Sequence, residues 1–156
     1  AAAHRRAMTA AESYLPVETQ GERDPSHVTA ELSRRARGFA TWALIRHFGR
    51  KRIAEMITRH CACARRFAER LAADAGVEIL NDVALNQVAV RFGNAEQTKA
   101  VIARIQAGGV TFVGGAQWRD HWIMRISVSS ETTTEADVDR SVEAMLEAWR
   151  AVRGRN

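Results

Sequence analysis

The feature that most constrains this chain is a change in the period of its apolar residues at Gly76. From Ile53 to Leu71, a mostly apolar stripe recurs at spacings of three and four, which predicts an amphipathic helix. In VAVRF, residues 88–92, large apolar side chains alternate with smaller or charged ones, which predicts a strand. Gly76 itself suits the left-handed residue that ends a helix. The chain must therefore combine helices with a sheet.

The same two periods predict further elements. We expect a helix over residues 32–48 that is apolar nearly all round, buried on several sides and ended by Gly49. Capping patterns predict a helix from Asn94 to a Gly-Gly pair, and another after Thr134. The expected strands cover residues 77–79, 88–92, 110–113 and 122–128, with Gly114-Gly115 as a tight turn.

This order of elements predicts the fold class. Short connections favour a mostly antiparallel sheet of about four strands, and helices with one apolar face are expected to cover one side of it. The result is an α/β arrangement of the α+β type. The 156 residues suffice for one domain with a real core. The sequence lacks an initiator Met, so we expect a fragment or a processed chain.

The net charge of +5 does not by itself indicate a nucleic-acid partner. Of the 23 Lys and Arg residues only Lys51 and Lys99 are lysines, and the arginines are scattered among acidic residues. This pattern is typical of an Arg- and Ala-rich composition, and we expect no nucleic acid partner. We expect no membrane partner either, because no uncharged apolar run approaches the roughly 20 residues of a membrane helix.

The two cysteines lie in the predicted second helix. Cys61 and Cys63 are two residues apart, so their side chains point about 200° apart and cannot share a metal ion. They are also too constrained to bridge each other. We expect two buried thiols in a reducing cytoplasm, a packed or half-exposed His60 beside them, and no metal site.

The strand WIMRISV, residues 122–128, places a charge on an otherwise apolar element. Alternate residues from Trp122 onward face the helices, whereas Ile123, Arg125 and Ser127 share the other face. No acidic residue accompanies Arg125 on that face, and an unpaired buried charge is costly. Arg125 therefore either pairs with an acid from elsewhere in the fold or binds an anionic ligand, since its planar fork suits a carboxylate.

The only tyrosine, Tyr14, lies in SYLPVETQGERDP, residues 13–25, which also holds both prolines and shows neither apolar period. A loop tyrosine commonly lays its ring on the protein surface. Loops also carry a large share of catalytic groups, and a tuned phenol can give or accept a proton. Both interpretations of Tyr14 are open on the residues alone.

Three separated runs resemble one known family, in the same order along the chain. They are ELSRRARGFATWALIRHFGRKRIAEMI from residue 31, EILNDVALNQVAVRF from residue 78 and GGAQWRDHWIMRISVSSETTTEADVDRSVEA from residue 114. They resemble the carboxy-terminal region of the group II pyridoxal-phosphate-dependent amino-acid decarboxylases, which include aromatic-L-amino-acid, histidine and glutamate decarboxylases. The resemblance runs from about Tyr14 to Trp149.

The resemblance implies a fold of the aspartate-aminotransferase type, fold type I. In that fold a large domain binds the cofactor, and a smaller carboxy-terminal domain closes part of the active site. It divides this chain into a mobile catalytic-loop segment with its lead-in (residues 1–30), a linker helix (31–50) and the carboxy-terminal small domain (51–156).

The resemblance also implies roles for single residues. Tyr14 matches the loop tyrosine thought to protonate the substrate carbon after carbon dioxide leaves. Arg125, in MRISVSS, matches the arginine that binds the substrate carboxylate in glutamate decarboxylase, and Ser33 matches a position near the cofactor. The family's cofactor lysine closely follows a histidine. Neither Lys51 nor Lys99 has that context, so we expect this lysine to precede residue 1.

We therefore expect the carboxy-terminal part of a carboxy-lyase that releases carbon dioxide and an amine from an L-amino acid. The expected cofactor is pyridoxal 5'-phosphate, held by the missing large domain, so the chain alone is expected to be inactive. The expected partners are the amino-acid substrate, the remainder of the enzyme and a second copy in a homodimer. Two alternatives are an aldehyde synthase of the same family, which Tyr14 disfavours, and a non-catalytic binding or assembly module encoded as a separate chain.

Overall fold

The computed structural model describes residues 35–154 of the chain. It divides into two units, one ending at His47 and one beginning at Phe48. Tyr14 and Ser33 lie outside the described residues, as do the whole expected loop segment and the first residues of the expected linker helix.

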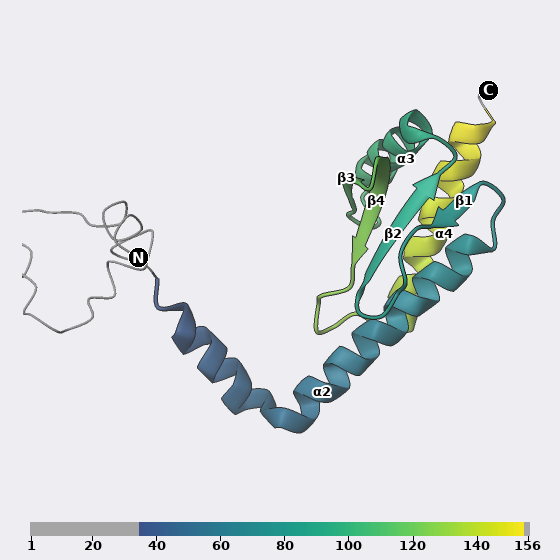
Figure 1. The fold of residues 1–156 in the computed structure, drawn as a ribbon. Coiled ribbons are helices and arrows are strands. Elements are labelled where there is room, and N and C mark those ends of the chain that lie inside the picture. The colour runs from purple at the N-terminus through teal and green to yellow at the C-terminus, as the bar shows by residue number, and fades with distance from the viewer. Residues whose placement is uncertain (1–34, 155–156) are drawn as a thin grey trace, which may run out of the picture. The chain divides into compact units, whose positions relative to one another are not determined.

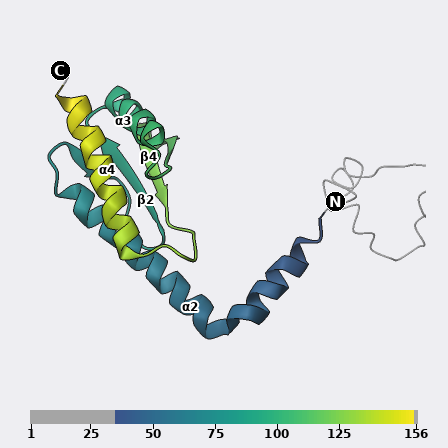
Figure 2. The same cartoon turned by 180° about the vertical axis from the view of Figure 1, so that it is seen from behind.

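The second unit contains a four-stranded sheet whose strand order is β1-β2-β4-β3, with every neighbouring pair antiparallel. The sheet lies in front of α3 and α4 in Figure 1 and behind them in Figure 2, so these helices cover one face of it. This confirms the expected fold class. The elements are α2 (Arg37–Ala72), β1 (Val77–Ile79), β2 (Gln87–Phe92), α3 (Ala95–Gly108), β3 (Gly114–Trp118), β4 (His121–Ser127) and α4 (Glu135–Arg153).

The core lies between the covered face of the sheet and the helices. It joins the second half of α2 to α3, α4 and the inward side chains of the strands, and its largest fully buried members are Phe92, Leu71, Met124 and Met145. Burying each such side chain stabilises the fold by about 1.5–3 kcal/mol. Because side chains alternate along β4, the same strand that buries Met124 leaves Arg125 exposed on the opposite face.

Local sequence signals set the ends of several elements. The Asn94 side chain accepts from the Gln97 amide at 2.9 Å, and the Gln97 side chain accepts from the Asn94 amide at 3.0 Å, which makes the predicted capping box. Thr134 and Asp137 make the equivalent box before α4. These bonds satisfy amides that a helix start leaves unpaired. Gly76 has a φ of 82°, as expected for the residue after a helix end.

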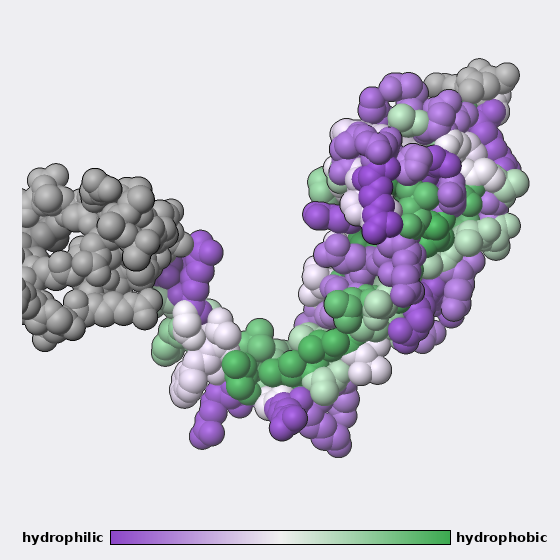
Figure 3. All heavy atoms as spheres, in the orientation of Figure 1, coloured by the Kyte–Doolittle hydropathy of each residue, from purple (hydrophilic) through white to green (hydrophobic). Residues whose placement is uncertain are grey.

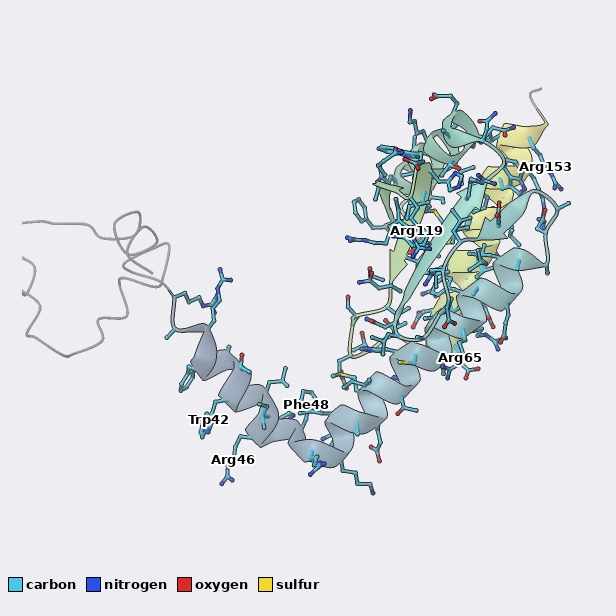
Figure 4. All side chains as sticks on the ribbon, viewed as in Figure 1. Trp42, Arg46, Phe48, Arg65, Arg119 and Arg153 are labelled. Carbon is cyan, nitrogen blue, oxygen red and sulfur yellow. The ribbon has the colours of Figure 1, made fainter. Side chains whose placement is uncertain are left out.

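The first expected helix differs from its prediction. It is joined to the second one within α2, although Gly49 interrupts the regular helix with φ 65° and ψ 171°. Its expected burial is wrong for the described chain, since Phe39 and Trp42 are 71% and 60% exposed. Figure 3 shows apolar surface along α2, and Figure 4 shows Trp42 and Arg46 projecting from this segment. An apolar pattern shows that a helix suits burial, but a covering partner must also be present.

The third strand also differs from its prediction. The expected strand at residues 110–113 and the expected turn at Gly114-Gly115 are wrong, because β3 begins at Gly114. The hairpin turn lies at Arg119-Asp120, where both residues have positive φ, 45° and 65°. A two-residue turn of this kind matches the twist of paired strands. Glycine has a low strand propensity, and here pairing with β4 overrides it.

Candidate functional site

The face of the sheet that α3 and α4 leave open carries the residue expected to bind an anion. Arg125 lies in the middle of β4 and is exposed. Its direct cross-strand partners are Ala89 on β2 and Gly114 on β3. Such partners share a face, with Cβ atoms about 4.5–5.5 Å apart. The Arg125 side chain therefore emerges between one residue with a single methyl group and one with no side chain.

Arg125 has no hydrogen-bonding or ionic partner within residues 35–154. The four described strands contain one acidic residue, Glu78, and Arg91 binds its carboxylate. The alternative in which Arg125 pairs with an internal acid thus finds no partner in this part of the chain. Arg125 is also exposed here, so the cost expected for an unpaired buried charge does not arise. Anion binding by Arg125 stays a prediction.

A pocket of about 210 Å³ lies beside Arg125 on this face. Apolar and aromatic groups form much of its wall, and the guanidinium is the cationic group among its lining residues. Ile123, which the sequence placed beside Arg125, is only 4% exposed, so its neighbours on the sheet already shield it from water. The pocket is lined by Asn81, Gln87, Val88, Ala89, Trp118, Ile123 and Arg125.

Two polar side chains of this face, those of Arg91 and Asn81, already have partners. Arg91 binds Glu78 and lies 3.1 Å from the Nδ1 atom of His121. The side-chain amide of Asn81 bridges strand residues, donating to the Gln87 carbonyl at 3.2 Å and accepting from the Ala89 amide at 2.8 Å. These contacts organise the face, whereas Arg125 is left able to bind something outside it.

Neither described lysine fits a cofactor lysine. Lys51 has a side chain 90% exposed and lies 3.9 Å from Glu55 on the next helical turn. Lys99 is held by Glu96 at 2.8 Å, with its ammonium 5.2 Å from the centre of the Trp122 ring. A lysine that holds the cofactor would have to be directed into a pocket that also accommodates the cofactor's phosphate and ring. The described residues do not form such a site.

The expected burial of both thiols of α2 is right for Cys63 and wrong for Cys61, which is only partly buried. Cys61 and Cys63 are free thiols, and burial, followed by the negative charge of Glu135, raises the pKa of Cys63. His60 is buried, with Nε2 2.8 Å from the carbonyl oxygen of Ser130, so it is packed as expected. Residues 35–154 contain no group of three or more side chains suited to holding a metal ion. Within that range, no helix has the length and apolar character needed to cross a bilayer.

Sequence reasoning missed Gly114, Ala89 and Trp118 as neighbours of Arg125. The alternation in VAVRF placed Ala89 on the non-core face, but nothing in it named the strand that would pair there. Trp118 shares a face of β3 with Ala116 and Gly114, but the two glycines at the start of this strand led us to expect a turn there. Recognising the hairpin turn at Arg119-Asp120 would have placed Trp118 on the same face as Arg125.

Comparison with known proteins gives consistent matches. Residues 4–93 match the profile of the pyridoxal-dependent decarboxylase conserved domain. The chain is 31% identical over 130 residues to an aromatic-L-amino-acid decarboxylase of Drosophila lebanonensis, covering 82% of this chain and 32% of that protein. It is 28% identical over 129 residues to a 4-hydroxyphenylacetaldehyde synthase of Rhodiola rosea, covering 78% of this chain and 26% of that protein.

The fold is similar to that of a solved structure, Oryza sativa TDC with PLP and tryptamine. The TM-score is 0.74 at 18% identity, over 92% of this chain and 32% of that one. At that identity the likeness concerns the fold alone. The chain spans about a third or less of the length of the relatives it matches.

Proposed function

This chain belongs to the family of pyridoxal-dependent decarboxylases, and from that premise we propose that it is the carboxy-terminal part of an amino-acid carboxy-lyase. The complete enzyme releases carbon dioxide and an amine from an L-amino acid. The family's cofactor is pyridoxal 5'-phosphate. The structural observation that carries the proposal is the unpaired Arg125 on the open face of the sheet.

Arg125 binds the substrate carboxylate in this proposal. A guanidinium presents two parallel N–H groups to a carboxylate, which fixes its orientation as well as its position. A decarboxylase gains no rate by stabilising in the ground state the carboxylate that it must expel. The contribution of Arg125 is therefore to hold the substrate in a reactive orientation.

Tyr14 donates a proton to the substrate carbon that has lost its carboxyl group. It lies outside the described residues, and its assignment rests on the SYL context and on the family match. A loop that opens for the substrate and closes over it excludes water while the carbon is reactive. A proton delivered by a positioned phenol then leads to the amine.

The remaining parts of the enzyme complete the site. Because neither Lys51 nor Lys99 fits the cofactor, the lysine that binds it belongs to a part of the protein outside this chain. Ser33 lies near the cofactor in this proposal, and the complete enzyme is a cytoplasmic homodimer. The chain by itself does not decarboxylate amino acids.

A second candidate reaction is oxidative aldehyde formation. The similarity to the Rhodiola rosea 4-hydroxyphenylacetaldehyde synthase supports keeping it. The presence of Tyr14, which can protonate the carbon, favours the amine as product. If the gene encoded these residues alone, a non-catalytic binding or assembly module would be favoured instead.

A substrate panel on the full-length, cofactor-loaded enzyme tests the proposal. We expect carbon dioxide and an amine from at least one L-amino acid. In Tyr14→Phe, amine release falls and aldehyde rises, because the proton donor is gone. Aldehyde as the main product of the unaltered enzyme would favour the second candidate, and absence of any turnover across the panel would contradict both.

A further inference from the structure

Gly114 is a glycine that the described fold does not require. Its φ is not positive, unlike those of Gly49, Gly76, Gly93 and Gly109. A Cβ atom built on it meets no atom within 4 Å. Glycine in a strand costs conformational entropy and gives no side-chain packing, so it commonly marks a place where a ligand or another backbone approaches.

The next residue provides a contrast. A Cβ on Gly115 would lie 2.9 Å from Cζ2 of Trp122, whose ring occupies that space. Packing within the chain therefore explains the glycine at 115 and not the one at 114. The side chain that Gly114 lacks would point to the open face of the sheet, the face that carries Arg125.

Gly114 is directly opposite Arg125 on that face. A side chain at position 114 would start about 5 Å from the Cβ of Arg125. An acidic side chain there would bind the guanidinium, and a large one would cover it. The other flank is Ala89, and the acid of this face, Glu78, is already bound to Arg91.

We propose that Gly114 is a positioning residue for substrate binding, because its lack of a side chain keeps Arg125 unpaired and open to a carboxylate arriving over β3. This inference rests on the proposed function of Arg125 as the carboxylate-binding residue. It adds the direction of approach and the residue that maintains it. The ligand is the carboxylate of an amino acid.

Two substitutions of equal size separate charge from bulk. Gly114→Asp places a carboxylate opposite Arg125, where it competes with the substrate carboxylate for the guanidinium. Gly114→Asn places a neutral side chain of the same shape there. Because a Cβ at this position meets no neighbour, both variants are expected to fold, which their thermal melts check.

The test measures kcat and KM of the full-length, cofactor-loaded enzyme with the amino acid that its substrate panel identifies. Loss of a hydrogen bond to a charged group weakens binding about tenfold or more. KM is therefore expected to rise about tenfold or more in Arg125→Gln and in Gly114→Asp. In Gly114→Asn it is expected to change less than about threefold. Adding Gly114→Asp to Arg125→Gln should then have no further effect, because both changes remove the same interaction.

A second readout does not depend on turnover. In the 156-residue chain, nuclear magnetic resonance of the Arg125 Nε–H group is expected to show slower exchange with solvent in Gly114→Asp than in Gly114→Asn. Slower exchange would show that the introduced carboxylate reaches the guanidinium.

The outcomes separate this inference from the function on which it rests. An unchanged KM in Arg125→Gln would overturn the role of Arg125, and the inference with it. A raised KM in Arg125→Gln with an unchanged KM in Gly114→Asp would overturn the inference alone. Equal effects of Gly114→Asp and Gly114→Asn would also overturn it, since Gly114 would then make room for another part of the enzyme.

Discussion

Arg66 on α2 donates two parallel hydrogen bonds to the carboxylate of Asp139 on α4, from Nε to Oδ1 at 2.7 Å and from a terminal nitrogen to Oδ2 at 2.8 Å. Arg70 binds the same carboxylate from the next turn of α2. Hydrogen bonds from Arg66 and then Arg70 hold the pKa of Asp139 well below its ordinary value. This cluster links two helices of the core by charge as well as by apolar packing.

The cluster predicts an acid-dependent stability. A carboxyl whose pKa is lower in the folded chain stabilises the fold above its unfolded-state pKa, about 3.9, and loses this contribution as pH falls below that value. Asp139→Asn should therefore lower the melting temperature at pH 7, and the difference from the unaltered chain should shrink below about pH 4.

Thermal melts between pH 2.5 and 7 measure this effect. Glu143→Gln is the control, since Glu143 is exposed on the same helix and lies outside the ion-pair cluster. A difference that stays constant with pH in Asp139→Asn, or one equally large in Glu143→Gln, would contradict the role of the cluster.

Neighbouring glycines of β3 should respond differently to alanine. In Gly115→Ala the new methyl group overlaps the Trp122 ring, so the free energy of unfolding should fall by about 1–3 kcal/mol. In Gly114→Ala the methyl group meets open space, and the change should lie within about 0.5 kcal/mol or be slightly stabilising. Urea titrations of the two variants measure these free energies. A larger loss of stability in Gly114→Ala than in Gly115→Ala would contradict the conclusion that only Gly115 is required by packing within the chain.

Of the tryptophans in residues 35–154, Trp149 is the one whose indole N–H group should contribute most to folding stability. It is 4% exposed, donates to the Ala75 carbonyl at 3.0 Å and packs its ring 5.8 Å from that of Phe92. Trp149→Phe is expected to lower the free energy of unfolding by about 1–3 kcal/mol.

Trp42→Phe is the matched control, because Trp42 is 60% exposed and its replacement should change stability by less than about 0.5 kcal/mol. Chemical denaturation followed by circular dichroism measures both. Equal losses in the two variants would show that Trp149 does not tie α4 to the residues after α2.

The lysines predict the outcome of a labelling experiment. When the chain is incubated with pyridoxal phosphate and reduced with borohydride, no stoichiometric adduct should form at Lys51 or Lys99, because neither lies in a site that could retain the cofactor. Peptide mass spectrometry locates any label, and the full-length enzyme treated in the same way is the positive control. Stoichiometric labelling of either residue would contradict the proposal that the cofactor lysine lies outside this chain.

Local chemistry made much of the fold predictable. The capping boxes at Asn94 and Thr134 and the left-handed Gly76 each depend on residues a few positions apart, so they could be read directly. The prediction failed at β3, because a strand that begins with two glycines has no local signal strong enough to distinguish it from a turn. The burial expected for Trp42 also failed, since a helix pattern does not contain its partner.

The sequence by itself determined the helices and the strands other than β3, and the alternation of side chains along β4 determined that Arg125 lies on the face away from the core. Tertiary structure alone decided that Gly114 and Ala89 stand opposite Arg125, and that Glu78 pairs with Arg91 instead. The physical reason is the distance along the chain over which each kind of interaction acts. Helix caps and side-chain periods arise from bonds between near neighbours, whereas strand register and ion pairing depend on which distant segments the whole core brings together.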